Sequence, residues 1–353
     1  MREKGRMYCA TDYDILPERE DNSAAFQRLI GLVSEQGGGT IFFPDGVYRF
    51  AAQTWALSHV NITGESKENT ILQMTGNVTE ETGPIALLYH HYPDDREKIL
   101  ADPIVGCTYS DFTVDASLMT TDRYRTGNKA FYFQNCIDCT WKDLNLIGTP
   151  ATALGVDCLV NCFITRVYCR DCGRVWEPGV RFGGAAIGIG AGLYDEENVI
   201  VSDCIVEGAG HFGIFFEHQA LFNPSVYRAQ PGGVIIKGNI VRGGRNHGIG
   251  ARGMSNLKIC SNLIYSNQNC GVYVDNQAMN IDISDNTIID SGEAGVCLNA
   301  AVHADYSGTT GNLDNVWVRN NLIKGSPEAI RLTKAAGKEI RGFVETGNTI
   351  VNL

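Results

Sequence analysis

The sequence returns several times to one short pattern, and this repetition limits what the chain can fold into. Residues 211–219 read HFGIFFEHQ, residues 246–254 read NHGIGARGM, and residues 269–277 read NCGVYVDNQ. Each copy has a glycine, apolar residues at alternate positions, and then a polar or charged residue. The glycines of four copies are 35, 23 and 24 residues apart: Gly213, Gly248, Gly271 and Gly295. We infer a repeat of about 23 residues, lengthened by insertions in some copies.

A second column of the repeat consists of asparagines, and it indicates how the copies stack. They lie in IIKGNIV, KICSNLI, ISDNTII, VRNNLI and VETGNTI, as Asn239, Asn262, Asn286, Asn321 and Asn348. The alternation of apolar residues over short runs predicts strands rather than helices. Repeats built only of strands are typical of a parallel β-helix, in which each coil stacks on the last. We expect the asparagines to form a buried ladder in which each side chain bonds to the next coil.

The N-terminal region has a different pattern. Asp21, Asn22 and Ser23 are candidate caps for a helix within about residues 20–37, with Phe26 and Leu29 on its apolar face. TIFF, PDG and VYRF then predict a strand, a turn and a strand. A solenoid exposes an apolar end that must be covered, and this helix is expected to cover it.

The same segment resembles the opening of the pectate-lyase-like β-helix proteins. The match comprises Asp21, Ala24, Ala25, Gln27, Gly37, Gly38, Gly39, Thr40, Pro44, Gly46, Tyr48 and Arg49. The resemblance implies an all-β fold: a right-handed parallel β-helix of about ten coils with an N-terminal capping helix. We expect one domain over residues 1–353, with coils from about residue 40 onward. That superfamily includes lyases, epimerases, glycoside hydrolases and phage tail proteins, so the resemblance specifies function poorly.

Composition narrows the partners. The net charge of −11 argues against nucleic acid or an anionic membrane. No run of 18 apolar residues occurs, and the first residues lack the apolar core of a signal peptide, so a cytoplasmic location is expected. Twelve cysteines then serve as small core residues, and Cys139 and Cys162, one repeat apart, are expected to stack. A zinc site is the alternative for the cysteines, but we expect no metal or cofactor.

One column of the repeat points outward and holds the candidate catalytic residues. In order it contains Gln134, Asp157, Gly190, Glu217, Arg252, Asp275, Asn299 and Thr333. The neighbouring outward column holds several glycines, expected to leave room for a flat ligand, and the aromatic residues Phe215 and Tyr273. Insertions at 173–184, 218–233 and 303–315 are expected to wall a cleft over this face.

Paired carboxylates in this column suit the hydrolysis of a sugar linkage. Carboxylates on alternate coils are roughly 9–10 Å apart at the backbone, and an acid and a base that activate water across a sugar need about 6.5–9.5 Å. We predict Glu217 and Asp275 as this pair, with Asp157 in reserve. Arg252 would orient the substrate, keep one carboxylate ionised and leave the other free to carry a proton. In the alternative interpretation, these charges only pair across coils to stabilise the stack.

Further residues are candidates for binding the substrate, each with a structural alternative. His218 has inward parity at a strand end, so it either turns into the cleft or is a structural histidine whose hydrogen bonds are satisfied. His211 and Asn246 extend the outward column, and Trp176 either stacks on a sugar or packs its own loop. The complete predicted substrate-binding set is Arg252, His218, Tyr273, Phe215, His211, Asn246, Asn299 and Trp176.

Three function classes remain open. The first is a glycoside hydrolase or glycosyl-transferring enzyme acting on an oligosaccharide or polysaccharide. The second is a polysaccharide lyase or uronate C5-epimerase, although the acidic column suits a uronate poorly. The third is a non-catalytic glycan-binding or phage-fibre module. The sequence also leaves open whether the chain forms a homo-oligomer.

Overall fold

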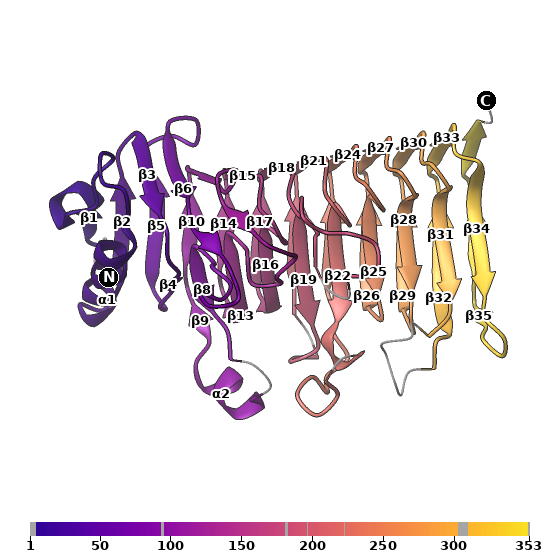
Figure 1. Cartoon of the computed structure of the whole chain (residues 1–353). Helices are drawn as coiled ribbons and strands as arrows, with labels where there is room; N and C mark the ends of the chain where they lie inside the picture. Colours follow the sequence, from indigo (N-terminus) through magenta and orange to yellow (C-terminus); the bar gives the residue numbers. More distant parts are fainter. Residues whose placement is uncertain are drawn as a thin grey trace.

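Three long parallel sheets run along a common axis and enclose an apolar core (Figure 1). The computed structural model describes residues 5–92, 95–180, 183–195, 197–221, 223–302 and 310–351. The first sheet contains β1 (Met7–Cys9), β2 (Gly39–Phe43), β5 (Val60–Gly64), β10 (Thr108–Ser110), β14 (Thr140–Lys142), β17 (Cys162–Thr165), β20 (Val199–Ser202), β23 (Val234–Lys237), β26 (Ser255–Cys260), β29 (Met279–Ser284), β32 (Leu313–Arg319), β35 (Ile340–Arg341) and β36 (Val344–Thr346).

The second and third sheets follow the same order along the axis. The second contains β3 (Gly46–Phe50), β6 (Thr70–Met74), β11 (Thr113–Asp115), β15 (Asn145–Ile147), β18 (Tyr168–Arg170), β21 (Ile205–Glu207), β24 (Ile240–Arg242), β27 (Leu263–Tyr265), β30 (Thr287–Ile289), β33 (Leu322–Lys324) and β37 (Thr349–Val351). The third contains β4 (Thr54–Trp55), β8 (Leu88–His90), β9 (Ile104–Val105), β13 (Phe131–Ile137), β16 (Leu154–Val160), β19 (Ile187–Ala191), β22 (Ile214–His218), β25 (Ile249–Arg252), β28 (Cys270–Asp275), β31 (Ala294–Ala300) and β34 (Glu328–Lys334).

The predicted parallel β-helix is therefore confirmed. The eleven strands of the second sheet give eleven coils in the described part of the chain, one more than expected. Inward positions match from coil to coil: Ile214 pairs with Ile249 and Ile249 with Val272, and all three are buried. Because side chains alternate along a strand, this register also fixes which residues point outward.

The asparagine column forms the predicted ladder. The Asn262 side chain accepts from the backbone N–H of Asn239 at 2.9 Å and from its amide group at 2.9 Å. Its own amide donates to the carbonyl of Ile236 at 3.0 Å and to Asn286 at 2.9 Å. The pattern continues through Asn286 and Asn321 to Asn348. Each buried amide is thus satisfied by the coils on both sides of it.

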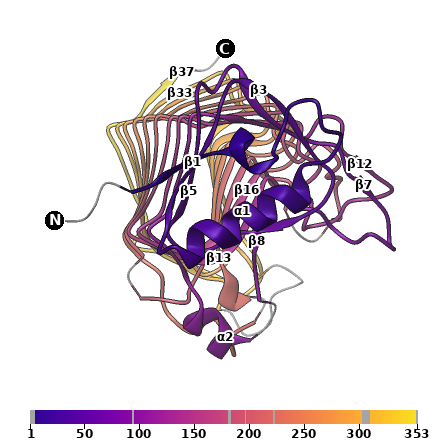
Figure 2. The ribbon, with the colours of Figure 1, turned by 90° about the vertical axis from the view of Figure 1, so that its left-hand side faces the viewer.

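A capping helix closes the N-terminal end, as predicted. Helix α1 (Ser23–Glu35) lies across the first coils when the molecule is viewed along its axis (Figure 2). Its buried Phe26 packs against Phe43 and Phe50, with ring centroids 5.4 Å apart in both pairs. Cysteine stacking is also confirmed, because the Cys139 N–H donates to the Cys162 sulfur at 3.4 Å and both residues are buried.

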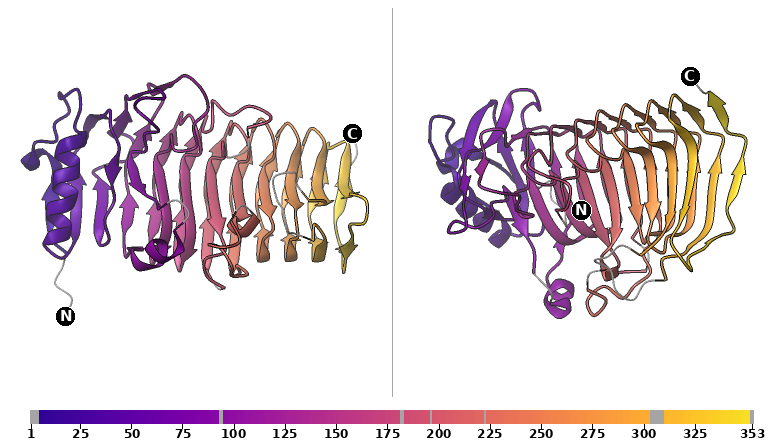
Figure 3. Two further views of the ribbon diagram at one scale, coloured as in Figure 1. Left: turned by 60° about the horizontal axis from the view of Figure 1, so that its bottom comes forward. Right: turned by 45° about the vertical axis from the view of Figure 1, so that its right-hand side comes forward.

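The longer connections project from the regular stack. Helix α2 (Arg96–Ala101) and the loop after β22 extend from one edge of the solenoid (Figures 1 and 2). The strands β7 (Asn77–Val78) and β12 (Thr120–Thr121) pair on another side, and 3₁₀ helices span Ala10–Tyr13 and Gln219–Leu221. Two further views show the coils stacking without interruption up to β34 (Figure 3). Neither helix among the described residues is long and apolar enough to cross a membrane.

The asparagine ladder yields a stability prediction. In Asn262→Asp, the added oxygen faces the Ile236 carbonyl and the Asn286 side-chain oxygen, where only a donor fits. We expect the variant to lose about 3–5 kcal/mol of unfolding free energy at neutral pH, because a buried charge without a partner is left behind. Chemical denaturation with circular dichroism measures this loss.

A matched substitution in a more exposed ladder provides the control. Asn280 bonds to Asn256 and Asn315 at the surface, and its backbone φ of 53° suits aspartate as well as asparagine. Asn280→Asp should change the unfolding free energy by less than about 1 kcal/mol. Equal losses in the two variants would contradict the role assigned to the buried ladder.

Candidate active site

The predicted outward column exists in the third sheet. Gly190 pairs with Glu217, Glu217 with Arg252, Arg252 with Asp275, and Asp275 with Asn299. Asp157 pairs with Gln134, and the pairing of Gly155 with Gly188 places Asp157 level with Gly190. The carboxylates expected on one wall therefore share it.

Part of this wall is buried rather than open to solvent, which corrects the expectation of an exposed face. Glu217 and Arg252 are each 9% exposed, and Asp275 is 2% exposed. Arg252 Nε lies 3.0 and 3.2 Å from the two Asp275 oxygens, and its Nη1 lies 3.4 Å from Glu217 Oε1. Arg252 thus contacts both carboxylates instead of leaving one free. The predicted pair of Glu217 and Asp275 has the geometry of a buried ion triad.

A cavity of about 380 Å³ opens on the N-terminal side of the triad. Asp157 and Glu217 both line it, with Gly190 between them, and Asp275 does not. The other lining residues are His91, Thr126, Lys129, Tyr132, Thr152, Gly183, Ala185, Gly188, Ile189, Phe215, Gln219, Asn223 and Tyr227. The structure therefore favours the reserve carboxylate, Asp157, over Asp275 as the partner of Glu217.

The two cavity carboxylates lie in different electrostatic environments. Burial raises the pKa of Asp157, while the Lys129 ammonium and the Gly190 N–H, 2.7 Å from Oδ1, oppose part of the rise. Glu217 lies beside the guanidinium of Arg252, which favours its ionised form. Asp157 is thus the carboxyl group whose pKa burial raises, whereas Glu217 shares a guanidinium with Asp275.

Lys129 is a site residue that the sequence did not reveal. It lies just before β13, is 7% exposed, and places Nζ 3.8 Å from the centre of the Tyr132 ring. Burial lowers its pKa to about 8, against the opposing pull of Asp157. A side chain at Gly155 would come within 2.6 Å of Lys129 Nζ, so that glycine makes room for the lysine. In the sequence, only the lack of a side chain at Gly155 indicated that another residue lies there, and we had interpreted that glycine as space for a ligand.

Other column glycines also accommodate neighbouring side chains. A Cβ at Gly190 would lie 2.5 Å from Gln219 and 2.7 Å from Asp157. One at Gly250 would lie 2.3 Å from the Phe212 ring. The expectation that the glycines of the neighbouring column clear a flat surface for a ligand is wrong at Gly155 and Gly250, although Gly188 of that column does line the cavity.

Two of the predicted insertions wall the cavity. Gly183 comes from 173–184, whereas Gln219, Asn223 and Tyr227 come from 218–233. The Gln134 amide donates to the Tyr227 hydroxyl, and Arg96 of α2 donates to the Val226 carbonyl, so that loop is held at two points. Most of the third insertion, residues 303–309, lies outside the described residues.

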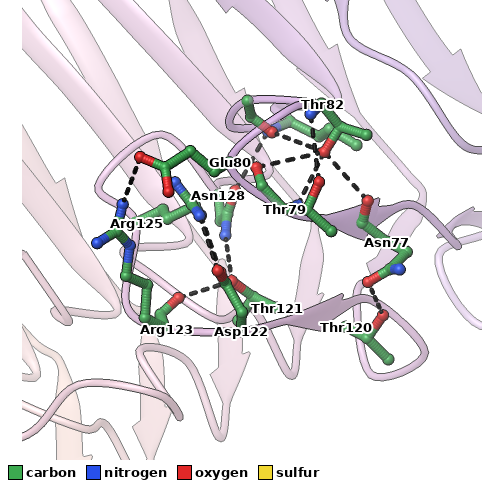
Figure 4. A network of polar contacts seen from close by, with 12 residues as sticks. Asn77, Thr79, Glu80, Thr82, Thr120, Thr121, Asp122, Arg123, Arg125 and Asn128 are labelled. Atoms are coloured by element: carbon green, nitrogen blue, oxygen red, sulfur yellow. Dashed lines mark hydrogen bonds and ion pairs between the residues drawn. The ribbon is translucent and has the colours of Figure 1, made fainter.

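Thr126 and Lys129 line the cavity, and a polar network holds the segment to which they belong (Figure 4). Arg125 pairs with Asp122 at 2.9 Å, and the Asn128 side chain accepts from the N–H of Ile85 at 3.2 Å. Thr120 donates to Asn77 at 2.7 Å, which joins β12 to β7. These contacts hold in place the segment that carries Lys129.

Most of the predicted substrate-binding residues lie outside the cavity. Phe215 lines it, whereas Arg252, His218, Tyr273, His211, Asn246, Asn299 and Trp176 do not. Trp176 stacks on His211 with centroids 4.2 Å apart, and His211 Nδ1 lies 3.0 Å from the Gly183 carbonyl, so the 173–184 insertion packs against the segment before β22. Asn299 donates to the Tyr273 hydroxyl at 2.8 Å, and Asn269 donates to Asn246 at 2.6 Å.

His218 is buried and does not line the cavity, but its Nε2 has no hydrogen-bond partner among the described residues, so it is not the satisfied structural histidine of the alternative either. Its side chain is 8% exposed and lies against the backbone of Gly192, where a Cβ would come within 2.4 Å of the ring. Burial lowers the pKa of His218, which favours the neutral ring.

Comparisons with known proteins agree with this fold. A family model described as "Right handed beta helix region" matches residues 225–323. No curated protein matches the sequence. The fold is similar to a mannuronan C-5 epimerase A-module of Azotobacter vinelandii, with a TM-score of 0.69, 15% identity, and coverage of 98% of this chain and 96% of that one.

Two other solved structures show how varied the proteins of this fold are. An exopolygalacturonase of Thermotoga maritima matches with a TM-score of 0.66 and 14% identity, covering 99% of this chain and 88% of that one. The Dettilon tailspike protein matches with a TM-score of 0.58 and 11% identity, covering 98% of this chain and 68% of that one. At these identities the comparisons establish the fold alone, so the activity must be inferred from the residues of the site.

The buried triad generates a prediction about stability. Arg252→Leu leaves Glu217 and Asp275 without their shared cation, so we expect a loss of about 3–5 kcal/mol of unfolding free energy at pH 7. Denaturant titrations of both proteins at pH 7 measure it. Arg166→Leu, which breaks the exposed pair with Asp143, should cost less than about 1 kcal/mol.

Proposed function

The chain is a right-handed parallel β-helix, and from its cavity we propose that the protein is a carbohydrate-active enzyme that hydrolyses a glycosidic bond. Asp157 is the proposed general acid and Glu217 the proposed general base. The observation that carries the proposal is the presence of these two carboxyl groups in one cavity, each beside a different cation and Asp157 with its pKa raised by burial. The solved structures of similar fold include proteins named for action on polysaccharides, which is consistent with a sugar substrate.

The roles follow from protonation. Asp157, whose pKa is raised by burial, donates its proton to the leaving oxygen as the bond from the anomeric carbon to that oxygen breaks. Glu217, beside Arg252, takes a proton from the water that attacks the anomeric carbon. One water is consumed, and the proton gained by Glu217 balances the one lost by Asp157.

The two carboxyl groups face the same cavity from alternate coils. Asp157 and Glu217 have Gly190 between them, so their backbones are about 9–10 Å apart. Asp157 Oδ1 accepts from the Gly190 N–H at 2.7 Å, so its carboxyl group leans over the intervening coil toward Glu217. Tyr132 and Phe215 line the same cavity and offer apolar surface for a sugar ring.

Lys129 supports a second candidate function, a lyase or C5-epimerase acting on a uronate. A lysine whose pKa is lowered to about 8 is partly neutral near physiological pH and is suited to abstract a proton. Its contact with Tyr132 places it on the cavity wall beside a second group able to transfer protons. The two carboxylates in the cavity disfavour a substrate with its own carboxylate, so hydrolysis remains the first proposal.

Turnover of defined oligosaccharides tests the catalytic assignment. We expect the protein to cleave at least one family of neutral oligosaccharides, and each product pair to gain one water by mass spectrometry. Asp157→Asn and Glu217→Gln should each lower kcat by about 10²- to 10⁴-fold. Asp275→Asn should retain more than about a tenth of the turnover, because Asp275 does not line the cavity.

An aspartate away from the cavity provides the control for these substitutions. Asp282 pairs with Arg319 on the first sheet, and Asp282→Asn should leave turnover unchanged. Products that carry an unsaturated uronide and have gained no water would replace hydrolysis with elimination. Undiminished turnover in both Asp157→Asn and Glu217→Gln would remove these residues from the mechanism. Sugar binding without turnover would favour a glycan-binding module.

The pH dependence separates the two chemistries. Lys129 lowers the pKa of Asp157, so in Lys129→Met that pKa rises and the general acid stays protonated to higher pH. For hydrolysis, the alkaline limb of kcat/KM should therefore move to higher pH. For proton abstraction, the same variant removes the base, and turnover should fall about 10²- to 10⁴-fold at every pH. Lys258→Met, at the pair with Asp282, is the control and should leave the pH profile unchanged.

A further inference from the structure

The outward column beside the catalytic one begins with three consecutive aromatic residues that the sequence analysis did not assign. Trp55 of β4 pairs with Tyr89 of β8, and Tyr89 pairs with Tyr132 of β13. The ring centroids are 4.8 Å apart for Trp55 and Tyr89, and 5.5 Å apart for Tyr89 and Tyr132. We call these three residues the aromatic track. Tyr132 lines the cavity, so the track leads from it toward the N-terminal cap.

The exposure of the track distinguishes it from core packing. Trp55 is 40% exposed and Tyr89 is half-buried, whereas Trp141, which points inward, is fully buried. On the first sheet, the described strands β5, β10 and β14 of the same coils carry no comparable row of outward aromatic residues. Its outward residues there include Asn61, Thr108 and Thr140, and Phe163 follows alone. The rings pack edge to face, with interplanar angles of 84° in both pairs, and form a stepped, partly exposed aromatic surface that continues from the cavity. Such a surface is expected where a ligand with apolar faces extends along the protein.

The track is held rigidly at its outer end. Gln27 of the capping helix accepts from the Trp55 backbone N–H at 2.6 Å, and its amide donates to the Trp55 carbonyl at 3.4 Å. The backbone of Trp55 is thus fixed while its indole stays exposed. A binding group positioned in advance loses less conformational entropy when the ligand binds.

The charge of the surface favours a neutral ligand. Between Trp55 and Gln134, the two outward columns hold Trp55, Tyr89, His91, Tyr132 and Gln134, and none of these is an arginine, lysine or carboxylate. Lys129 over Tyr132 is the nearby cation, and it already faces Asp157. A polyuronate would find little compensation for its charges along this path.

We propose that the aromatic track binds the sugar units of a neutral oligosaccharide chain that extends from the cavity toward the N-terminal cap. The proposal rests on the proposed function for the position of the reacting bond. From Tyr132 to Trp55 is two strand spacings, about 10 Å, so the track reaches beyond the sugar in the cavity. The substrate is then a chain rather than a disaccharide.

Chain length is the variable that tests the track. The probes are the di- and hexasaccharides of cellulose, xylan, starch and inulin, with di- and hexagalacturonate as charged counterparts. Binding is measured by calorimetry with the Glu217→Gln variant as background, and kcat/KM is measured with the active protein. Trp55→Ala and Tyr89→Ala should each weaken binding of the preferred neutral hexasaccharide about 2- to 10-fold, and Trp55→Ala should lower kcat/KM less for the disaccharide than for the hexasaccharide.

Two further variants separate stacking from general damage to the fold. Trp55→Phe retains an aromatic face and should keep most of the hexasaccharide affinity. Phe163→Ala removes an aromatic residue of similar exposure, 47%, from the first sheet and should change nothing. An equal loss in Phe163→Ala, or no loss in either track variant, would overturn the proposal. Tighter binding of hexagalacturonate than of every neutral hexasaccharide would overturn the assignment of a neutral chain.

The results also separate the track from the catalytic proposal. If the unmodified chain binds a neutral hexasaccharide through Trp55 and Tyr89 but cleaves none of the probes, the track stands and the proposed hydrolysis fails. If cleavage requires Asp157 and Glu217 but neither track variant changes hexasaccharide binding or cleavage, the proposed hydrolysis is supported and the proposed track is wrong. Absence of binding to every hexasaccharide would overturn the track.

Discussion

The structure depends on one constraint: each coil must stack in register on the coil before it. The backbone pairs in parallel along all three long sheets, and the buried asparagines repeat the same link from Asn239 to Asn348 through side chains. A shift of one residue would turn every outward side chain into the core. The columns of the sequence are therefore columns in space, and the site is built by placing different residues at equivalent positions of successive coils.

This stacking brings charges about 4.8 Å apart, so their order along a column is restricted. Glu217, Arg252 and Asp275 alternate in sign, and each carboxylate is compensated by the cation between them. On the other side of Glu217 the column has Gly190, which separates it from Asp157 by a full coil. The glycine thus allows two carboxyl groups to share a cavity without being adjacent. The triad of Glu217, Arg252 and Asp275 holds Glu217 in place. Pairing of charges across coils, which was the structural alternative to catalysis, is therefore compatible with the proposed chemistry.

The sequence predicted the fold well because the fold is periodic. Spacings of about 23 residues, period-two alternation and the asparagine column each define the stacking of neighbouring coils, and all were visible in the chain. The cavity depends on contacts that follow no period. Gln134 reaches Tyr227 across 93 positions, and Lys129 enters over Gly155 from a connection between coils. Parity could place Glu217 and Asp275 on one wall, but it could not show that the cavity would open at Asp157 and that Asp275 would be buried.

Glycines in the outward columns illustrate why such a site is hard to infer. In sequence, Gly155, Gly190 and Gly250 look alike, as positions without a side chain on a binding face. In the structure Gly155 admits a lysine, Gly190 admits Gln219 and Asp157, and Gly250 admits the Phe212 ring. A missing side chain in a stacked column marks the place where another part of the chain crosses it. Such glycines are therefore a guide to where connections return to the wall, and the residues that cross there, Lys129 and Gln219, line the cavity of this protein.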